Sequence, residues 1–244
     1  MGRAARYRSA QPLRAMTSAL PRWVAAAALL SGLIWAGLLS QQHLAGKASL
    51  IDRFETVLLD LRITLTGQRP APDDIVIVAI DDRTVSEAGS YPLSRKTLAD
   101  LILKIREAGA AALAVDILLS GASGETDDAA LTAALKTLPA VIAVAAQVSE
   151  TEQTANAVPV VREALAPDTR FADVATEGLV NIVTDGGGTP RHIPLLFLAD
   201  SGLQPAFSLK ALELGTGKTP SMTADGVRIG DRELPLDLGW HLAL

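Results

Sequence analysis

The chain has 244 residues and no cysteine, which excludes disulfides and metal sites built on thiolates. Hydrophobic residues make up 49% of it and aromatic residues only 4%, so aliphatic side chains must build the core. Residues 1–22 carry five arginines and no acid, which leaves 17 of the 22 basic residues against all 27 acidic ones, a net charge of −10. This acidic body argues against a nucleic-acid partner.

Residues 23–40 contain no charge, and 18 residues in a helix span about 27 Å, close to the hydrocarbon thickness of a membrane. We therefore predict a transmembrane helix over residues 23–44. The arginines before it place the N-terminus in the cytoplasm and the remainder outside the membrane. A cleaved signal peptide and a buried core helix are the alternatives.

Apolar residues recur at helical spacing from residue 50 to 65, which predicts a juxtamembrane helix after the span. A proline-rich linker ends it. The expected organisation is a basic N-terminus (1–22), a transmembrane helix (23–44), a juxtamembrane helix and linker (45–70) and an extracytoplasmic α/β domain (71–244).

The first half of that domain is typical of a parallel sheet. Residues 75–80 (IVIVAI) and 111–119 are apolar runs that read as buried strands, and a helix capped by Ser94 is expected between them, up to residue 108. A helix from Thr126 or Asp127 to residue 138 and a strand over 141–148 continue the alternation. Three such units favour a doubly wound arrangement with right-handed crossovers.

The second half is less regular. Short helical pieces are expected at 161–165 and 170–175, and strands at 178–184 and 191–199 read as an antiparallel hairpin. A helix over 206–215 and a hairpin of 227–229 with 233–236 follow. The predicted fold is α/β, a mainly parallel sheet with helices on both faces plus antiparallel hairpins. Because the sequence stops within an apolar run, we expect the domain to be incomplete.

Acidic residues cluster where ligand sites form in α/β folds. Asp81, Asp82 and Asp116 lie at the carboxyl ends of two predicted neighbouring strands, and Asp127 begins the next helix together with Asp128. A pocket for a cation or polar ligand is one interpretation, and helix capping is the other. Asp81 could also pair with Arg95. The candidate ligand-binding residues are therefore Asp81, Asp82, Arg95, Asp116 and Asp127.

No catalytic constellation is recognisable. Asp81 and Thr84 lack the spacing of an aspartyl phosphatase, and the glycines at 215–217 lack that of a phosphate-binding loop. The three histidines share no metal-ligand spacing. Arg191 and His192 read as an exposed strand end. We predict no enzymatic activity, cofactor or metal for this chain.

Several stretches occur in an order that resembles the second class of CHASE domains, the extracytoplasmic sensory modules of bacterial adenylate cyclases, histidine kinases and related receptors. The resemblance covers residues 55–240 and rests on the following motifs: Asp60-x-Arg62, IVIVAIDD (75–82), Gly89-x-x-Pro92-x-x-Arg95, AGA before AVDILL (108–119), ETDDAAL (125–131), GLVNIVTDGGGTPRHIPL (178–195) and PAFSLKALEL (205–214). Tyr91 and Leu93 replace the tryptophans usual around the proline, so an aromatic ligand platform is not expected there.

The resemblance implies a sensor fragment, with an unknown extracytoplasmic ligand, that would act as a homodimer in a receptor. Further membrane helices and a cytoplasmic cyclase or kinase domain would follow the chain. A membrane-anchored α/β enzyme or a scaffolding domain is the alternative function; the sequence beyond the last residue would discriminate between them.

Overall fold

The structure is a computed structural model that describes residues 21–44, 50–68, 70–148, 158–184, 189–223, 226–236 and 239–243. The basic N-terminus up to residue 20 and the glycine turn at 185–188 lie outside the described residues. The chain divides into two compact units, residues 1–42 and 43–244.

The first unit contains helix α1 (Arg22–Leu44), which has no buried residues within its apolar stretch. Residues 22–42 have a mean hydropathy of 1.8 and are long and apolar enough to cross a membrane. Its large side chains are exposed all round; Trp23 is 73% and Trp35 65% exposed. A helix that is apolar on every side is stable when it is surrounded by lipid or by other protein.

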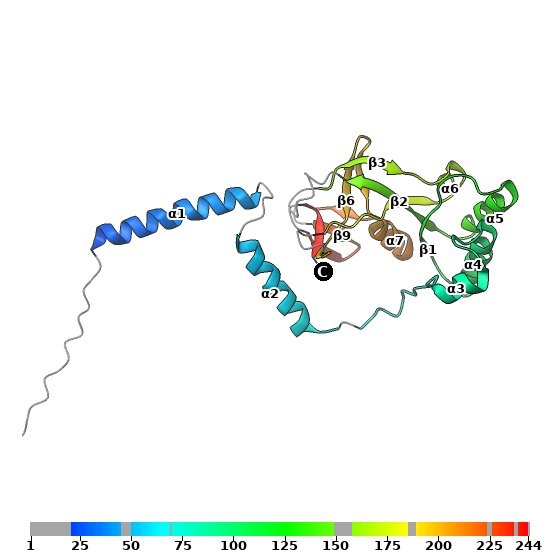
Figure 1. Cartoon of the computed structure of the whole chain (residues 1–244), viewed down its shortest axis with the longest axis horizontal. Helices are drawn as coiled ribbons and strands as arrows, with labels where there is room; N and C mark the ends of the chain where they lie inside the picture. The colour runs from blue at the N-terminus through cyan, green and yellow to red at the C-terminus, as the bar shows by residue number, and fades with distance from the viewer. Residues whose placement is uncertain are drawn as a thin grey trace, which may run out of the picture. The chain divides into compact units, whose positions relative to one another are not determined.

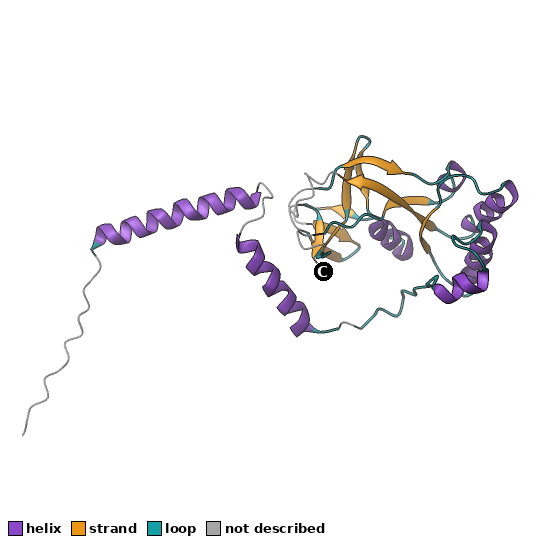
Figure 2. Cartoon of the chain, viewed as in Figure 1, coloured by secondary structure: helices purple, strands orange, loops and turns teal. Residues whose placement is uncertain are grey.

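The second unit begins with helix α2 (Leu50–Thr66), as the helical spacing predicts. Residues 67–68 and 70–81 form no helix or strand and lead to α3 (Asp82–Ala88), a short helix that the sequence did not predict. Figure 2 draws the described residues between α2 and α3 as loop. The strand predicted at 75–80 is therefore wrong for this structure: these residues have no regular secondary structure and pair with no strand among the described residues.

A four-stranded sheet forms the centre of the second unit (Figure 1). Strand β1 (Leu113–Leu118) and strand β4 (Thr176–Leu179) both run parallel to β2 (Ala140–Val148). Strand β3 (Val161–Leu165) pairs antiparallel with the end of β2, so the helical piece predicted at 161–165 is wrong. The mixed α/β class and its parallel sheet are confirmed.

Helices α4 (Arg95–Glu107) and α5 (Glu125–Leu135) pack against each other and join the largest hydrophobic cluster. Ser94 caps α4 as predicted, with its hydroxyl accepting from the Thr97 amide at 3.0 Å. Helix α5 begins earlier than predicted, with Gly124 at the N-cap position. The members of the cluster shared by these helices and the sheet include Leu98, Ile102, Val115, Leu131, Leu135, Ile142 and Phe171.

Three small antiparallel sheets complete the fold. They are β6 (Leu196–Ala199) with β7 (Gly202–Pro205), β5 (His192–Pro194) with β11 (His241–Ala243), and β9 (Gly226–Ile229) between β8 (Ser221–Met222) and β10 (Arg232–Pro235). The predicted hairpin of 227–229 with 233–236 is confirmed.

The predicted hairpin of 178–184 with 191–199 is wrong, because the second run breaks at Leu195 and its halves pair elsewhere. Only one antiparallel bridge, Val183 to His192, joins the two runs among the described residues. Asn181 instead ties its segment to β2: its amide donates to the Ala146 carbonyl at 2.6 Å and accepts from the Ala146 amide at 2.8 Å. Helix α6 (Thr169–Ala172) agrees with the prediction at 170–175.

Helix α7 (Phe207–Thr216) lies against β4 so closely that only glycine fits at position 178. A Cβ on Gly178 would come within 2.5 Å of the Phe207 Cα, which real Cβ contacts do not tolerate. The helix ends at Gly217, whose φ of 65° is left-handed, and not at Gly215 as predicted.

We expect Gly178→Ala to destabilise the second unit by about 1–3 kcal/mol, because backbone must move to admit the methyl group. Gly215→Ala is the matched control: its Cβ meets nothing within 4 Å, and alanine favours a helix by up to about 1 kcal/mol. Urea unfolding followed by circular dichroism measures both. Equal stability of the two variants would contradict the close packing of α7 on β4.

Candidate functional site

The five predicted site residues do not meet in one pocket. The carboxylate of Asp81 caps α3, accepting from the Thr84 amide at 2.8 Å and its hydroxyl at 2.7 Å. These hydrogen bonds lower the pKa of Asp81. Asp82 in the first turn of α3 and Asp116 on β1 are exposed, and Asp127 is half-buried on α5. The capping interpretation thus holds for Asp81, and ligand binding by all five stays a prediction.

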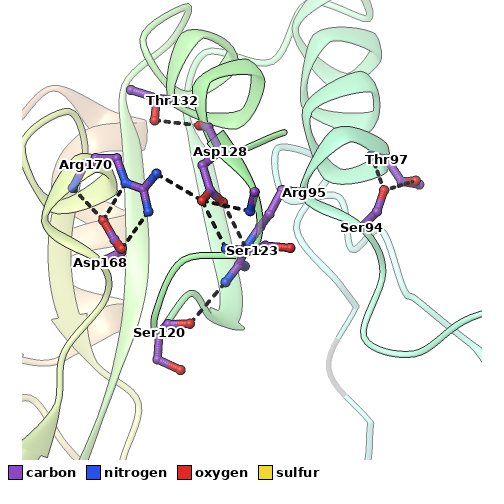
Figure 3. Close-up of polar contacts among 10 residues, drawn as sticks. Ser94, Arg95, Thr97, Ser120, Ser123, Asp128, Thr132, Asp168 and Arg170 are labelled. Atoms are coloured by element: carbon purple, nitrogen blue, oxygen red, sulfur yellow. Dashed lines mark hydrogen bonds and ion pairs between the residues drawn. The ribbon is translucent and has the colours of Figure 1, made fainter. Parts of the chain in front are cut away.

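The polar centre of the fold is instead the carboxylate of Asp128, which is fully buried. Its Oδ2 accepts from the amides of Ser123 at 3.0 Å and Gly124 at 3.3 Å (Figure 3). Arg170 reaches the same oxygen at 3.0 Å. Because a buried charge must be both paired and hydrogen-bonded, this carboxylate determines how the 120–124 loop lies over the start of α5.

Arg95 is the one predicted site residue that joins this centre. It extends from the first turn of α4 and is 12% exposed, with its Nε 3.9 Å from Asp128 Oδ1. The predicted pair with Asp81 is absent among the described residues. The guanidinium also lies over the Phe171 ring, 5.4 Å from its centroid, and donates to the Ser120 carbonyl at 3.4 Å. Arg95 therefore links α4, the end of β1 and α6.

Asp168 completes the group. It caps α6 and forms a two-pronged pair with Arg170, with Nε–Oδ1 and Nη2–Oδ2 distances of 2.9 Å. Hydrogen bonds from the Arg170 side chain and amide lower the pKa of Asp168 to about 2, and the same pair raises the pKa of Arg170. We call Arg95, Asp128, Asp168 and Arg170 the Asp128 network.

The Asp128 network is suited to holding structure. Two carboxyl groups face two guanidiniums, so their formal charges cancel, and hydrogen-bond donors hold both acids in place. The only atom of the network in a buried position without a hydrogen bond is Asp128 Oδ1, which faces the Arg95 guanidinium at ion-pair distance. Within the described residues there is no group of three metal-ligating side chains.

A shallow hollow of about 190 Å³ lies between β2, β3, β4 and β7, and no member of the Asp128 network lines it. Its walls are mainly aliphatic, including Val144, Val161 and Leu179, and Glu177 is its one charged lining residue. The sequence did not indicate this hollow, because its walls come from strands that are distant in the chain.

A second polar contact joins α2 to the sheet-forming region. The Arg191 guanidinium donates from Nε to Asp60 Oδ1 at 3.1 Å and from Nη2 to Oδ2 at 3.0 Å, across 131 residues of sequence. Arg191 directly precedes β5 and is only 13% exposed, so the interpretation as an exposed strand end is wrong. A bidentate pair of this geometry fixes both distance and orientation.

A model of the CHASE2 domain family matches residues 25–241, nearly the whole chain. The chain belongs to the CHASE2 family. No curated protein and no solved structure is similar enough to add to this assignment. The matched range includes both Asp60 and Arg191 and all four members of the Asp128 network.

CHASE2 domains are sensory and not catalytic, which agrees with the absence of a recognisable catalytic motif in the sequence. The sensory domain and the apolar helix α1 together indicate a membrane protein with an extracellular domain. The ordered motifs in the sequence thus identified the correct family.

The sequence indicates that Asp127 and Asp128 begin a helix but does not distinguish their roles. It does not indicate Asp168 and Arg170 as site residues. One signal was available: Asp168 precedes a short helix with Arg170 two residues on, a spacing that suits a capping carboxylate paired with its own helix. Nothing in the sequence indicated that this pair would meet Asp128.

We expect Asp128→Asn to cost about 3 kcal/mol, the lower end for breaking a buried ion pair, because Arg170 remains 39% exposed to water. The neighbouring Asp127→Asn is the matched control and should change stability by less than about 0.5 kcal/mol. Urea unfolding at neutral pH measures both. A mild effect of Asp128→Asn would show that the buried carboxylate does not hold the network.

The pKa of Asp168 falls from 3.8 to about 2 on folding, so the unfolded chain binds its proton more tightly. Its stabilising contribution is present above pH 4 and is lost as the pH falls from about 4 to about 2. We expect Asp168→Asn to flatten this part of the stability–pH curve, measured by thermal unfolding. Glu163→Gln, an exposed residue of β3, should leave the curve unchanged. Identical curves for Asp168→Asn and the parent chain would refute the assignment.

Proposed function

We propose that this CHASE2 domain is the extracytoplasmic sensor of a bacterial membrane receptor and relays its state to a cytoplasmic cyclase or kinase domain outside this chain. The family supports sensing, and α1 supports membrane attachment. Five arginines before α1 favour a cytoplasmic N-terminus and a sensor outside the inner membrane. In the receptor we propose that two copies pair.

The observation that carries the relay is the pair of Asp60 and Arg191. Helix α2 follows α1 in sequence, and in the part of α2 whose side chains are described, Val57, Leu58, Leu61 and Leu65 are 52–77% exposed and so contribute little packing against the domain. A bidentate pair transmits orientation where hydrophobic packing does not. Movement of β5 in the domain would therefore be transmitted through Arg191 to α2.

The pair connects α2 to a region that is itself well anchored. Strand β5 pairs with β11, and Leu195 after it belongs to a buried cluster with Leu209 of α7 and Val227 of β9. A change in how these elements pack has a direct route to Arg191. For the cue itself we propose a polar ligand or cation recognised by the acidic residues that the sequence indicated, Asp81, Asp82, Asp116 and Asp127, with Arg95.

The relay is tested first on this chain, which has no native cysteine to complicate labelling. Spin labels at Thr64→Cys on α2 and Ser221→Cys on β8 report the distance between the helix and the domain by pulsed electron resonance in nanodiscs. We expect Asp60→Asn to broaden the distance distribution, because the pair that orients α2 is lost. Arg62→Gln, an exposed charge on the same helix, is the matched control and should leave it narrow.

The second readout is the output of the complete receptor in isolated membranes. Asp60→Arg and Arg191→Asp should each reduce the response to its stimulus by about 5–150-fold, the usual range of coupling energies, and the double exchange should restore it. Broadened distances with unchanged output would mean that the contact exists but does not relay. Unchanged distances would remove the contact itself.

A further inference from the structure

Residues 75–80 are exposed to a degree that is unusual for their composition. Ile75 is 65%, Val76 81%, Ile77 87% and Val78 50% exposed, and residues 75–80 belong to no helix or strand. β-branched residues favour strands, and a contiguous apolar surface of this kind marks a place where something binds. The segment thus has the composition of a strand, but it pairs with no strand among the described residues.

One edge of strand β1 is unpaired among the described residues. All its pairing partners lie in β2, and among the described residues no strand lies along its other side. Such an edge presents a row of backbone groups suited to pairing with an added strand. Leu118 at the end of β1 is 41% exposed, so apolar side-chain surface is open beside this edge as well.

Ile80 already links residues 75–80 to the hydrophobic cluster beside β1. It is half-buried and packs against the cluster that contains Val115 and Leu119. Because side chains alternate between the two faces of a strand, Val78 and Val76 would share the face of Ile80 once the segment is a strand. Continuing the segment beside β1 would place them over the same cluster, next to its partly buried member Leu113.

The chain direction suits a parallel pairing. Arg95 in the first turn of α4 donates to the Ser120 carbonyl just beyond β1, so α4 starts at the carboxyl end of the strand. A segment that ends at Ile80, followed by α3, α4 and then β1, has the order of a strand–helix–strand unit. Such units place their two strands parallel, with a right-handed crossover.

We propose that residues 75–80 dock reversibly on the free edge of β1 as a parallel strand, and that the structure holds the undocked state. Docking would bring Asp81 to the carboxyl end of β1, near Arg95 and Ser120. It would also shorten the free connection after α2 from residues 67–81 to residues 67–74. A ligand held by the acidic residues and the position of α2 then belong to one two-state equilibrium. That consequence rests on the proposed relay; the docking does not.

Amide hydrogen exchange on the full chain in nanodiscs tests the docking. In a parallel edge strand every second residue points its amide and carbonyl toward the neighbour, so we expect exchange to be slowed at least tenfold at alternate amides of 75–80. Val78→Lys should abolish this pattern, while Leu61→Lys on α2, which is 52% exposed against 50% for Val78, should retain it. Fast exchange at all six amides, or protection that survives Val78→Lys, would overturn the proposal.

Cross-linking identifies the partner of the segment. The pair Ile77→Cys and Asp116→Cys, treated with a short bifunctional thiol reagent, should give a cross-linked monomer. Ile77→Cys with Ser221→Cys, in the separate sheet of β8, β9 and β10, is the control and should not. Cross-linked dimers would mean that the segment pairs with a second copy, and this would refute docking within one chain. If docking is observed but a variant that abolishes it leaves the output of the complete receptor unchanged, the docking proposal stands and its proposed role in the relay is refuted.

Discussion

The buried carboxylate of Asp128 is the constraint on which the rest of the domain depends. With no contact to solvent, the charge requires compensation from groups that the chain must bring from three places: Arg95 at the start of α4, the amides of Ser123 and Gly124, and Arg170 on α6. Each of these contacts orders a loop at the carboxyl end of β1. Hydrophobic burial stabilises the core, and this network determines how the loops above it are arranged.

A polar contact also determines how α2 is connected to the rest of the second unit. Helix α2 exposes much of its apolar surface, and its bidentate contact to Arg191 defines an orientation without burying the helix. The pair is only partly accessible to water, since the Arg191 side chain is 13% and that of Asp60 54% exposed, and it rests on two hydrogen bonds that a rearrangement of the domain can break. A sensor benefits from this balance, because a firmly packed helix could not respond to small differences between two states of the domain.

Elements with a strong local signal were predictable. Helix α4 has a serine cap and a clear apolar face, β2 is apolar throughout, and the turn at Gly230 separates two short strands. The errors have a common cause. The 161–165 segment became a strand and the 191–199 run split at Leu195 because of which neighbours their backbones found. Residues 75–80 show the opposite effect: their composition favours a strand, but among the described residues no strand pairs with them.

The sequence by itself determined the family and the long apolar helix α1, because ordered motifs and hydropathy are properties of the chain alone. Tertiary structure decided which acids matter and what they do. Asp81 and Asp128 are both carboxylates near helix starts, yet one caps an exposed helix and the other anchors a buried network. The two differ in burial and in whether a partner distant in sequence, Arg170, reaches the carboxylate. The pair of Asp60 and Arg191 depends in the same way on folding, because only the folded chain brings such groups together.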